Sequence, residues 1–442
     1  MRIQLSDHFT YGRLLRFTLP SIVMMVFTSV YSVVDGLFIS NFAGKTAFAA
    51  INLTAPPFII LGALGFMIGT GGTAVVARTL GEGERDRANR YFSMLVYATV
   101  IGGAAITAAA LLLLPAMTRR LGAEGQMLSD CLLYGRVVCL ALPFFMLQNV
   151  FQTFFVAAEK PRLGLAVAVG AGVVNMALDA LLVMVLRWGL WGAAFATALS
   201  QVTGGVVPIL YFARENDSLL RLGRTRFYGR VLGETCFNGL SEMVSSASAA
   251  VVTILYNFQL MRLAGEDGIA AFGVLCYVDF VFVAIFLGYA QGSAPVISFH
   301  YGAQDRPELK SLLRKSAVLM GAAGVAMTTL SEVLSGVIAD VFVGYDAGLR
   351  AMTANGLRIY ALSFLLCGFN IFGSSFFTAL GNGRVSAAIS FLRTFLFESA
   401  AVLLLPRLLG LNGVWLAFLP AQLLALAVTL IFLARNRAHY GY

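Results

Sequence analysis

The chain has 442 residues, of which 59% are hydrophobic and only 12% are charged, and its mean hydropathy is +0.83. Soluble domains carry about 25% Asp, Glu, Lys and Arg, so this composition excludes an ordinary water-soluble protein. The formal net charge of +9 does not indicate nucleic-acid binding, because the basic residues lie in short loops between apolar runs, where they set membrane topology.

Apolar runs follow one another along the whole chain. Each is long enough to cross about 30 Å of hydrocarbon as a helix, which takes about 20 residues. The runs are continuously apolar, which predicts helices rather than barrel strands. The first run is too long for the apolar part of a signal peptide, so we expect it to be a membrane span. The twelve expected spans are 17–39, 50–77, 91–116, 131–157, 163–186, 190–213, 235–261, 269–299, 311–338, 353–379, 385–406 and 413–434.

The basic residues predict the orientation. An even number of spans places both termini on one side of the membrane, and assigning that side to the cytoplasm puts most of the 31 Lys and Arg in cytoplasmic segments. The densest basic groups lie within 78–90, 214–230 and 306–315. The positive-inside rule therefore predicts a multi-pass protein of a bacterial or archaeal plasma (inner) membrane, with both termini cytoplasmic.

The chain repeats weakly with an offset of 221 residues. Gly81 and Arg85 recur as Gly302 and Arg306, each pair at the exit of a span into a basic loop. Six spans per half give both halves the same orientation, which predicts a pseudo-twofold axis along the membrane normal and a central cavity between the halves. We expect an all-α polytopic fold with a six-helix bundle at 1–214, a cytoplasmic linker at 215–232 and a second bundle at 233–442.

Four oxygen-bearing side chains are expected at one depth in the first bundle. A carboxylate inside a span costs about 2.5 kcal/mol or more to insert, so Asp35 and Asp179 are functional candidates. Asn175 lies four residues before Asp179, on the same helical face, and Thr197 lies in the next span. Such oxygens suit an exchanging proton or a small hard cation such as Na⁺. The structural alternative is a hydrogen-bond cluster that only holds the spans together.

The second bundle has different ionisable residues. Alanines stand where the repeat would place Asp179. Glu242 and Asp279 could attract a cationic substrate, although Glu242 could also reach the membrane interface from its position near a helix end. The roles of Glu332, Arg393 and Glu398 stay open, because the five-residue spacing of the last two allows only a loose intrahelical pair in an α-helix.

Pro20 has two interpretations. If the first helix begins near Arg13, Pro20 removes a backbone hydrogen bond and makes a hinge; if the helix begins at Phe17, it is an ordinary starting proline.

Enzyme chemistry is not indicated. The three His are too far apart in sequence to form a metal motif, no phosphate-binding loop is present, and the five Cys have no disulfide or metal spacing. We therefore expect neither catalysis, nor a bound metal other than a possible Na⁺, nor a cofactor other than a coupling ion.

The chain resembles the multidrug and toxic compound extrusion (MATE) family along its whole length. The resemblance rests on the twelve spans in two halves, on "LPSIVMMVFTSVYSVVDGLFIS" (19–40), on the Gly-x-x-x-Arg after spans 2 and 8, and on Asn175-x-x-x-Asp179 followed by Thr197. These N-terminal residues are similar to the DinF-like branch, in which Asp35 would complete a cation site and Pro20 would match a bending point. The stretches 239–257 and 291–303 resemble the MepA-like branch.

The resemblance implies a secondary-active exporter of amphipathic, cationic compounds, driven by inward flow of H⁺ or Na⁺ through alternating access. We expect it to work as a monomer in the lipid bilayer. A flippase for lipid-linked oligosaccharides is the nearest alternative, but it would have a basic cavity, whereas the candidates here are acidic. A non-transporting receptor or channel is a further alternative.

Overall fold

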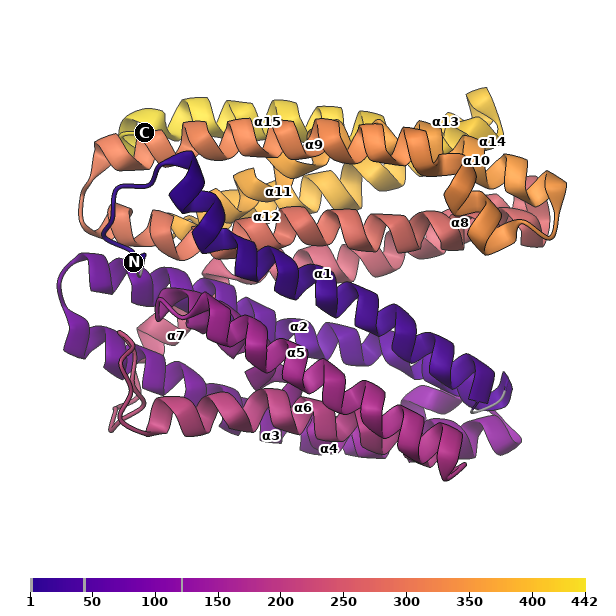
Figure 1. Cartoon of the computed structure of the whole chain (residues 1–442), viewed down its shortest axis with the longest axis horizontal. Coiled ribbons are helices and arrows are strands. Elements are labelled where there is room, and N and C mark those ends of the chain that lie inside the picture. The colour runs from indigo at the N-terminus through magenta and orange to yellow at the C-terminus, as the bar shows by residue number, and fades with distance from the viewer. Residues whose placement is uncertain (1–2, 43–44, 121) are drawn as a thin grey trace.

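The computed structural model describes residues 3–42, 45–120 and 122–442, without the side chains of 36–49, 52 and 56. All regular secondary structure in this described part is helical, which confirms the predicted all-α fold. The helices form two bundles that lie one above the other in Figure 1.

The first bundle contains the six predicted N-terminal spans. The fifth helix changes, at the candidate Asp179, from α-helix into a π-helical segment. The elements are α1 (Tyr11–Phe42), α2 (Lys45–Gly81), α3 (Arg85–Arg120), α4 (Gly125–Ala157), α5 (Pro161–Leu178) with η1 (Asp179–Val185), and α6 (Leu190–Ala213).

The second bundle follows a connection over residues 214–228 and has more interruptions. A second π-helical segment, η2, divides its fifth span. The elements are α7 (Gly229–Asn238), α8 (Leu240–Gly302), α9 (Arg306–Val343), α10 (Ala347–Ala361), α11 (Phe364–Ala379), α12 (Gly383–Ser390), η2 (Phe391–Glu398), α13 (Ser399–Leu409), α14 (Leu411–Leu416) and α15 (Phe418–Tyr440).

The number of spans agrees with the sequence. Within the described ranges, ten helices are long and apolar enough to cross a membrane, and eleven if α10 and α11, bent by 49°, form one span. The helix α8 has 63 residues and would be about 95 Å long if straight, far more than a bilayer needs. Gly265 interrupts it with φ 62° and ψ −145°, a conformation that suits glycine. Counting its two arms separately adds one span to the eleven and gives the predicted twelve.

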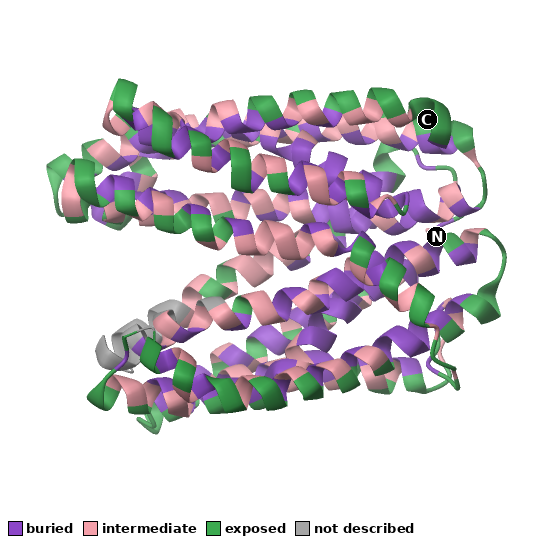
Figure 2. Ribbon diagram, turned by 180° about the vertical axis from the view of Figure 1, so that it is seen from behind, coloured by how far each residue is buried: buried purple, intermediate pink, exposed green. Residues whose placement is uncertain are grey.

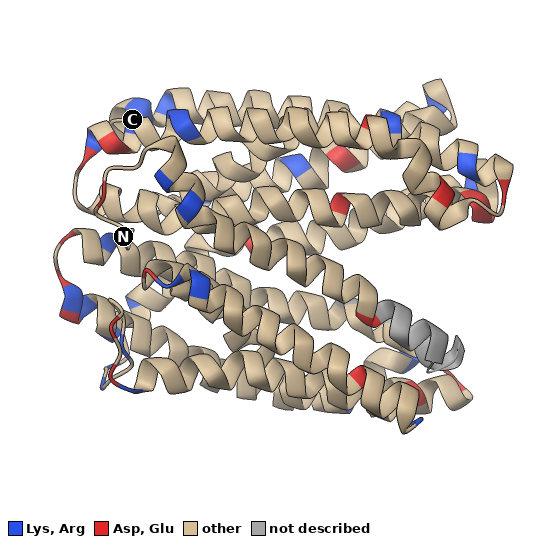
Figure 3. Cartoon of the chain, viewed as in Figure 1, with Lys and Arg blue, Asp and Glu red and all other residues tan. Residues whose placement is uncertain are grey.

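The two bundles converge at the end that carries both termini, and diverge at the opposite end (Figures 1 and 2). We call these the terminal end and the far end. Buried residues are concentrated where the bundles converge (Figure 2). Most Lys and Arg lie near the ends of the helices, especially at the terminal end (Figure 3).

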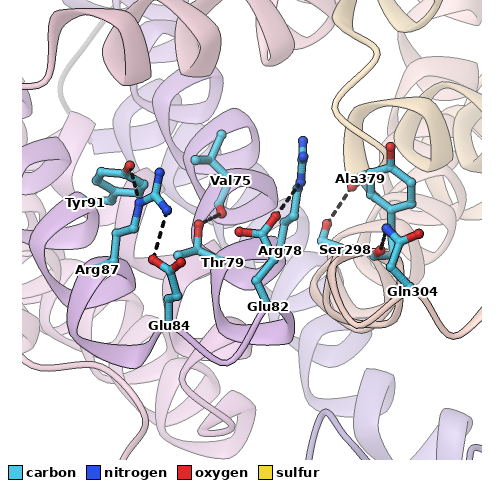
Figure 4. A network of polar contacts seen from close by, with 11 residues as sticks. Val75, Arg78, Thr79, Glu82, Glu84, Arg87, Tyr91, Ser298, Gln304 and Ala379 are labelled. Atoms are coloured by element: carbon cyan, nitrogen blue, oxygen red, sulfur yellow. Dashed lines mark hydrogen bonds and ion pairs between the residues drawn. The ribbon is translucent and has the colours of Figure 1, made fainter.

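Glycines allow this convergence. A Cβ on Gly81 would overlap the carbonyl oxygen of Phe299, and a Cβ on Gly302 would overlap that of Arg78. Gly302 lies 221 positions after Gly81, and Phe299 lies 221 positions after Arg78. The sequence repeat therefore relates the two contacts to each other. Figure 4 shows the surrounding polar groups, with the ion pair between Arg78 of α2 and Glu82, just after α2, near the end of α8.

Candidate functional site

Close packing of α1, α5 and α6 positions the candidate site in the first bundle. Gly172 on α5 faces the ring of Phe27 on α1, and a Cβ there would overlap that ring. The Ser200 hydroxyl of α6 donates a hydrogen bond of 2.8 Å to the Ala171 carbonyl of α5. These contacts bring the far halves of three helices together, which is where the predicted residues lie.

The structure brings the four predicted residues of the first bundle into one region. The carboxyl groups of Asp35 and Asp179 lie next to each other, and Asn175 lies beside Asp35. Thr197 lies beside the hydroxyl of Tyr134 on α4, which is itself within electrostatic range of both carboxyl groups. We call these five residues the first cluster.

Five oxygens of the first cluster are buried and have no hydrogen bond of normal geometry to any described residue. This holds for Oδ1 of Asp35, both Oδ atoms of Asp179, Oδ1 of Asn175 and Oγ1 of Thr197. Buried polar atoms almost always have a partner, and leaving one without costs about 1–3 kcal/mol. No Lys or Arg of the described side chains is among the groups that act on the two carboxyl groups. The arrangement therefore fits a proton or a small cation between the carboxyl groups.

Two tyrosines at this site were not predicted. Tyr31 lies within electrostatic range of both carboxyl groups, and its position four residues before Asp35 on the same helix was a usable signal. Tyr134 had no such signal, because its contact with Thr197 joins two helices that are far apart in the sequence. The π-helical start at Asp179 was also not predictable from hydropathy. Such segments are rare in proteins overall, but those that occur often lie at functional sites.

A second acidic cluster lies in the second bundle. The Tyr360 hydroxyl of α10 donates a hydrogen bond of 3.2 Å to Oδ1 of Asp279 on α8. Glu398, 7% exposed, lies near Asp279 and near the Tyr256 hydroxyl, although that hydroxyl is buried without a hydrogen bond of normal geometry. The guanidinium of Arg393 is within electrostatic range of both acids. We call these five residues the second cluster.

The π-helical segment η2 explains why Arg393 and Glu398 belong to one cluster. The α-helical spacing predicted only a loose pair. In a π-helix the hydrogen bonds run from residue i to i+5, so residues five apart lie on one face. The predicted substrate-path residue Glu242 also lies within electrostatic range of Arg393, so Arg393 connects Glu242 to the second cluster.

The structure places Pro20 in the interior of α1, which begins at Tyr11. It therefore removes a backbone hydrogen bond within the helix, as the hinge interpretation requires. The neighbouring Thr18 and Ile22 pack against Gly292 and Gly288 of α8, with no room for a Cβ on Gly288. Pro20 thus lies in the part of α1 that contacts the second bundle, and its role as a hinge remains a prediction.

Known proteins are similar in sequence to this chain over almost its whole length. The chain is 24% identical to the "Multidrug export protein MepA" of Staphylococcus saprophyticus over 437 residues, covering 96% of this chain and 94% of the relative. It is 25% identical to the protein of the same name from Staphylococcus aureus over 433 residues, covering 97% and 94%.

Two solved structures have the same fold. One is described as MATE in complex with MaL6, with a TM-score of 0.93, 20% identity and 98% of each chain covered. The other is described as the outward-facing conformation of a multidrug resistance MATE family transporter of the MOP superfamily. Its TM-score is 0.92 at 21% identity, with 98% and 97% covered.

The match to a family model covers both bundles. The model described as MatE matches residues 20–181 and 243–400, which is most of the chain. The first segment contains Asp35, Asn175 and Asp179, and the second contains Asp279, Arg393 and Glu398. Members of this family are transporters, not enzymes. The chain therefore belongs to the MatE family of membrane transporters.

Proposed function

We propose that the protein is a secondary-active multidrug efflux antiporter that exports amphipathic, cationic organic compounds in exchange for H⁺ or Na⁺. The family and the relatives named as multidrug export proteins support the export of varied small molecules. The observation that supports ion coupling is the pair Asp35 and Asp179, because three of their carboxylate oxygens are buried without a hydrogen-bond partner among the described residues. A site built this way is satisfied only when it receives a proton or a cation.

The coupling would work through α1. This helix carries Asp35 in its far half and contacts α8 near Pro20, so an ion at the first cluster can favour one arrangement of the two bundles. It can do so only if the two arrangements bind the ion with different affinities. One charge moving through 100 mV supplies about 2.3 kcal/mol, enough for roughly a 50-fold substrate gradient.

The second cluster supports a cationic substrate. Three carboxyl groups, those of Asp279, Glu398 and the nearby Glu242, share Arg393 as the cation that acts on them among the described side chains. A region with excess carboxylate attracts organic cations and repels anions. Anionic lipid-linked sugars would need the opposite charge, so this observation favours an exporter of cations over a flippase.

The proposed location is a plasma (inner) membrane, with the terminal end in the cytoplasm and the transporter acting as a monomer. The basic residues at the terminal end support this orientation. Cysteines introduced in place of Glu84 and Asp305, both in turns at the terminal end, should react with membrane-impermeant reagents only from inside. A cysteine in place of Asp346, in the turn before α10, should react only from outside. Labelling of the cysteine at position 84 from outside intact cells would show that the protein has the opposite orientation.

Reconstitution tests the proposed exchange directly. Purified protein in liposomes is given either a pH gradient or a Na⁺ gradient, with a fluorescent organic cation as substrate and protein-free liposomes as control. We expect substrate to move against its gradient with one of the two ions and to stop when that ion gradient is collapsed. Substrate movement that follows only its own gradient, with neither ion having an effect, would contradict ion exchange.

A further inference from the structure

The segment before α1 runs across the terminal end between the two bundles (Figure 1). We call residues 3–10 the N-terminal strap. Leu5 and Phe9 are both 0% exposed, although the strap is not part of a membrane span. Both belong to one apolar cluster that also contains Val156 of α4 and Leu309 of α9. The strap is therefore packed between a helix of the first bundle and a helix of the second.

The strap is held on the second bundle by several polar contacts. The Phe9 N–H donates a hydrogen bond of 2.9 Å to Oε1 of Glu308. The other oxygen of Glu308 pairs with Nδ1 of His8 at 2.6 Å, and Lys315 Nζ donates to the Phe9 carbonyl. Glu308 is only 6% exposed, so its charge is matched by groups of the strap rather than by water. The Phe9 ring also meets His300 edge to face.

A hydrogen bond also joins the strap to the first bundle. The Leu5 N–H donates to Oε1 of Glu159, in the turn between α4 and α5, at 2.7 Å. Glu159 has a φ of 58°, a conformation that non-glycine residues seldom adopt and that persists where the surroundings require it. A carboxylate from each bundle thus accepts a backbone N–H from the same short strap.

We propose that the N-terminal strap is a latch that stabilises the arrangement in which the terminal end is closed. The Leu5 and Phe9 nitrogens are four residues apart, so extended chain between them reaches at most about 14 Å. Motion that separates Glu159 from Glu308 beyond this reach breaks one attachment. This step rests on the proposed alternating access of the bundles.

The test measures the distance between the bundles, without transport. Spin labels replace Asp86 in α3 and Gln304 in the turn after α8, in a background without the native cysteines. Glu159→Ala removes the acceptor, and Glu159→Gln, which keeps an oxygen acceptor, is the matched control. Leu5→Ser weakens the packing without changing Glu159. Loss of one hydrogen bond should raise the ratio of open to closed terminal ends roughly three- to tenfold. Glu159→Gln should stay close to wild type.

Unchanged distance distributions in both Glu159→Ala and Leu5→Ser would overturn the latch. Failure of gradient-driven transport in wild type would contradict the proposed function alone, because these distances are measured without a gradient.

Discussion

The two acidic clusters differ in how their charge is balanced. In the first, Asp35 and Asp179 lie together with Asn175, and no Lys or Arg of the described side chains acts on them. In the second, Arg393 acts on both Asp279 and Glu398. The first cluster therefore needs an external ion to become neutral, whereas the second contains part of its own compensation. This difference supports the proposal that the first cluster couples ions and that the second attracts cations.

The packing of the two bundles is more symmetric than the distribution of their acidic residues. The 221-residue repeat preserves the glycine contacts that close the terminal end, at Gly81 and Gly302, and each fifth span contains a π-helical segment. The acids are not preserved, since Ala400 stands where the repeat would place Asp179. Symmetric packing suits a rocking motion, and the asymmetric charge supports the proposal that the two bundles have different tasks.

The largest expected effect comes from neutralising the first cluster. Asp35→Asn and Asp179→Asn should insert and fold normally, because removal of a membrane-buried charge lowers the cost of insertion. Each should abolish gradient-driven export while substrate binding persists, as measured by transport in liposomes and by ligand fluorescence. Asp86→Asn, an exposed acid on α3, is the control. The double variant should be little worse than either single one, since both residues serve one site. Full export by both single variants would place coupling elsewhere.

Removing the cation of the second cluster should lower the stability of the protein, unlike neutralisation of the first cluster. Arg393→Leu leaves the nearby carboxylates of Asp279 and Glu398 without their cation. Removing one partner of a buried charge pair costs about 3–5 kcal/mol. We expect a clear fall in the melting temperature of the purified protein, and little change for Asp35→Asn. Equal melting temperatures of Arg393→Leu and Asp35→Asn would contradict the proposal that Arg393 compensates the charge of the second cluster.

Substrates of different charge should reveal a role for the second cluster that the first cluster does not have. Glu242→Gln and Asp279→Asn reduce the excess of carboxylate in the second bundle, so export of organic cations should fall several-fold more than export of neutral compounds. Transport assays with a matched cationic and neutral dye pair measure this ratio. A parallel loss for both dyes would indicate that these acids serve only the structure.

The smallest effects are expected from the neutral oxygens of the first cluster. Asn175→Ala and Thr197→Ala each remove one uncharged oxygen, worth about 1 kcal/mol or roughly a fivefold change in ion affinity. Export should persist, with its pH or Na⁺ dependence shifted to higher ion concentration. A complete loss of export in Thr197→Ala, with the protein still folded, would give Thr197 a larger role than an auxiliary ligand.

Hydropathy alone predicted the spans, because continuous apolar runs have few alternatives in a membrane. The shared face of Asn175 and Asp179 was also predictable, since it depends only on helical spacing. Contacts between distant helices were not, which is why Tyr134 beside Thr197 was missed. The pairing of Arg393 with Glu398 was underestimated because it depends on a local change from α- to π-helix. The N-terminal strap was missed because its few apolar residues are too short a run for a hydropathy pattern.

Direct ion binding tests the assignment of coupling to the first cluster. Purified protein in weakly buffered detergent solution is titrated with Na⁺ in a calorimeter, and its proton uptake is followed with a pH indicator. We expect wild type to take up one of the two ions, and Asp35→Asn and Asp179→Asn to lose that uptake. Asp279→Asn and Glu398→Gln should keep it. Loss of ion uptake in the variants of the second cluster, with uptake retained in Asp35→Asn and Asp179→Asn, would contradict the account.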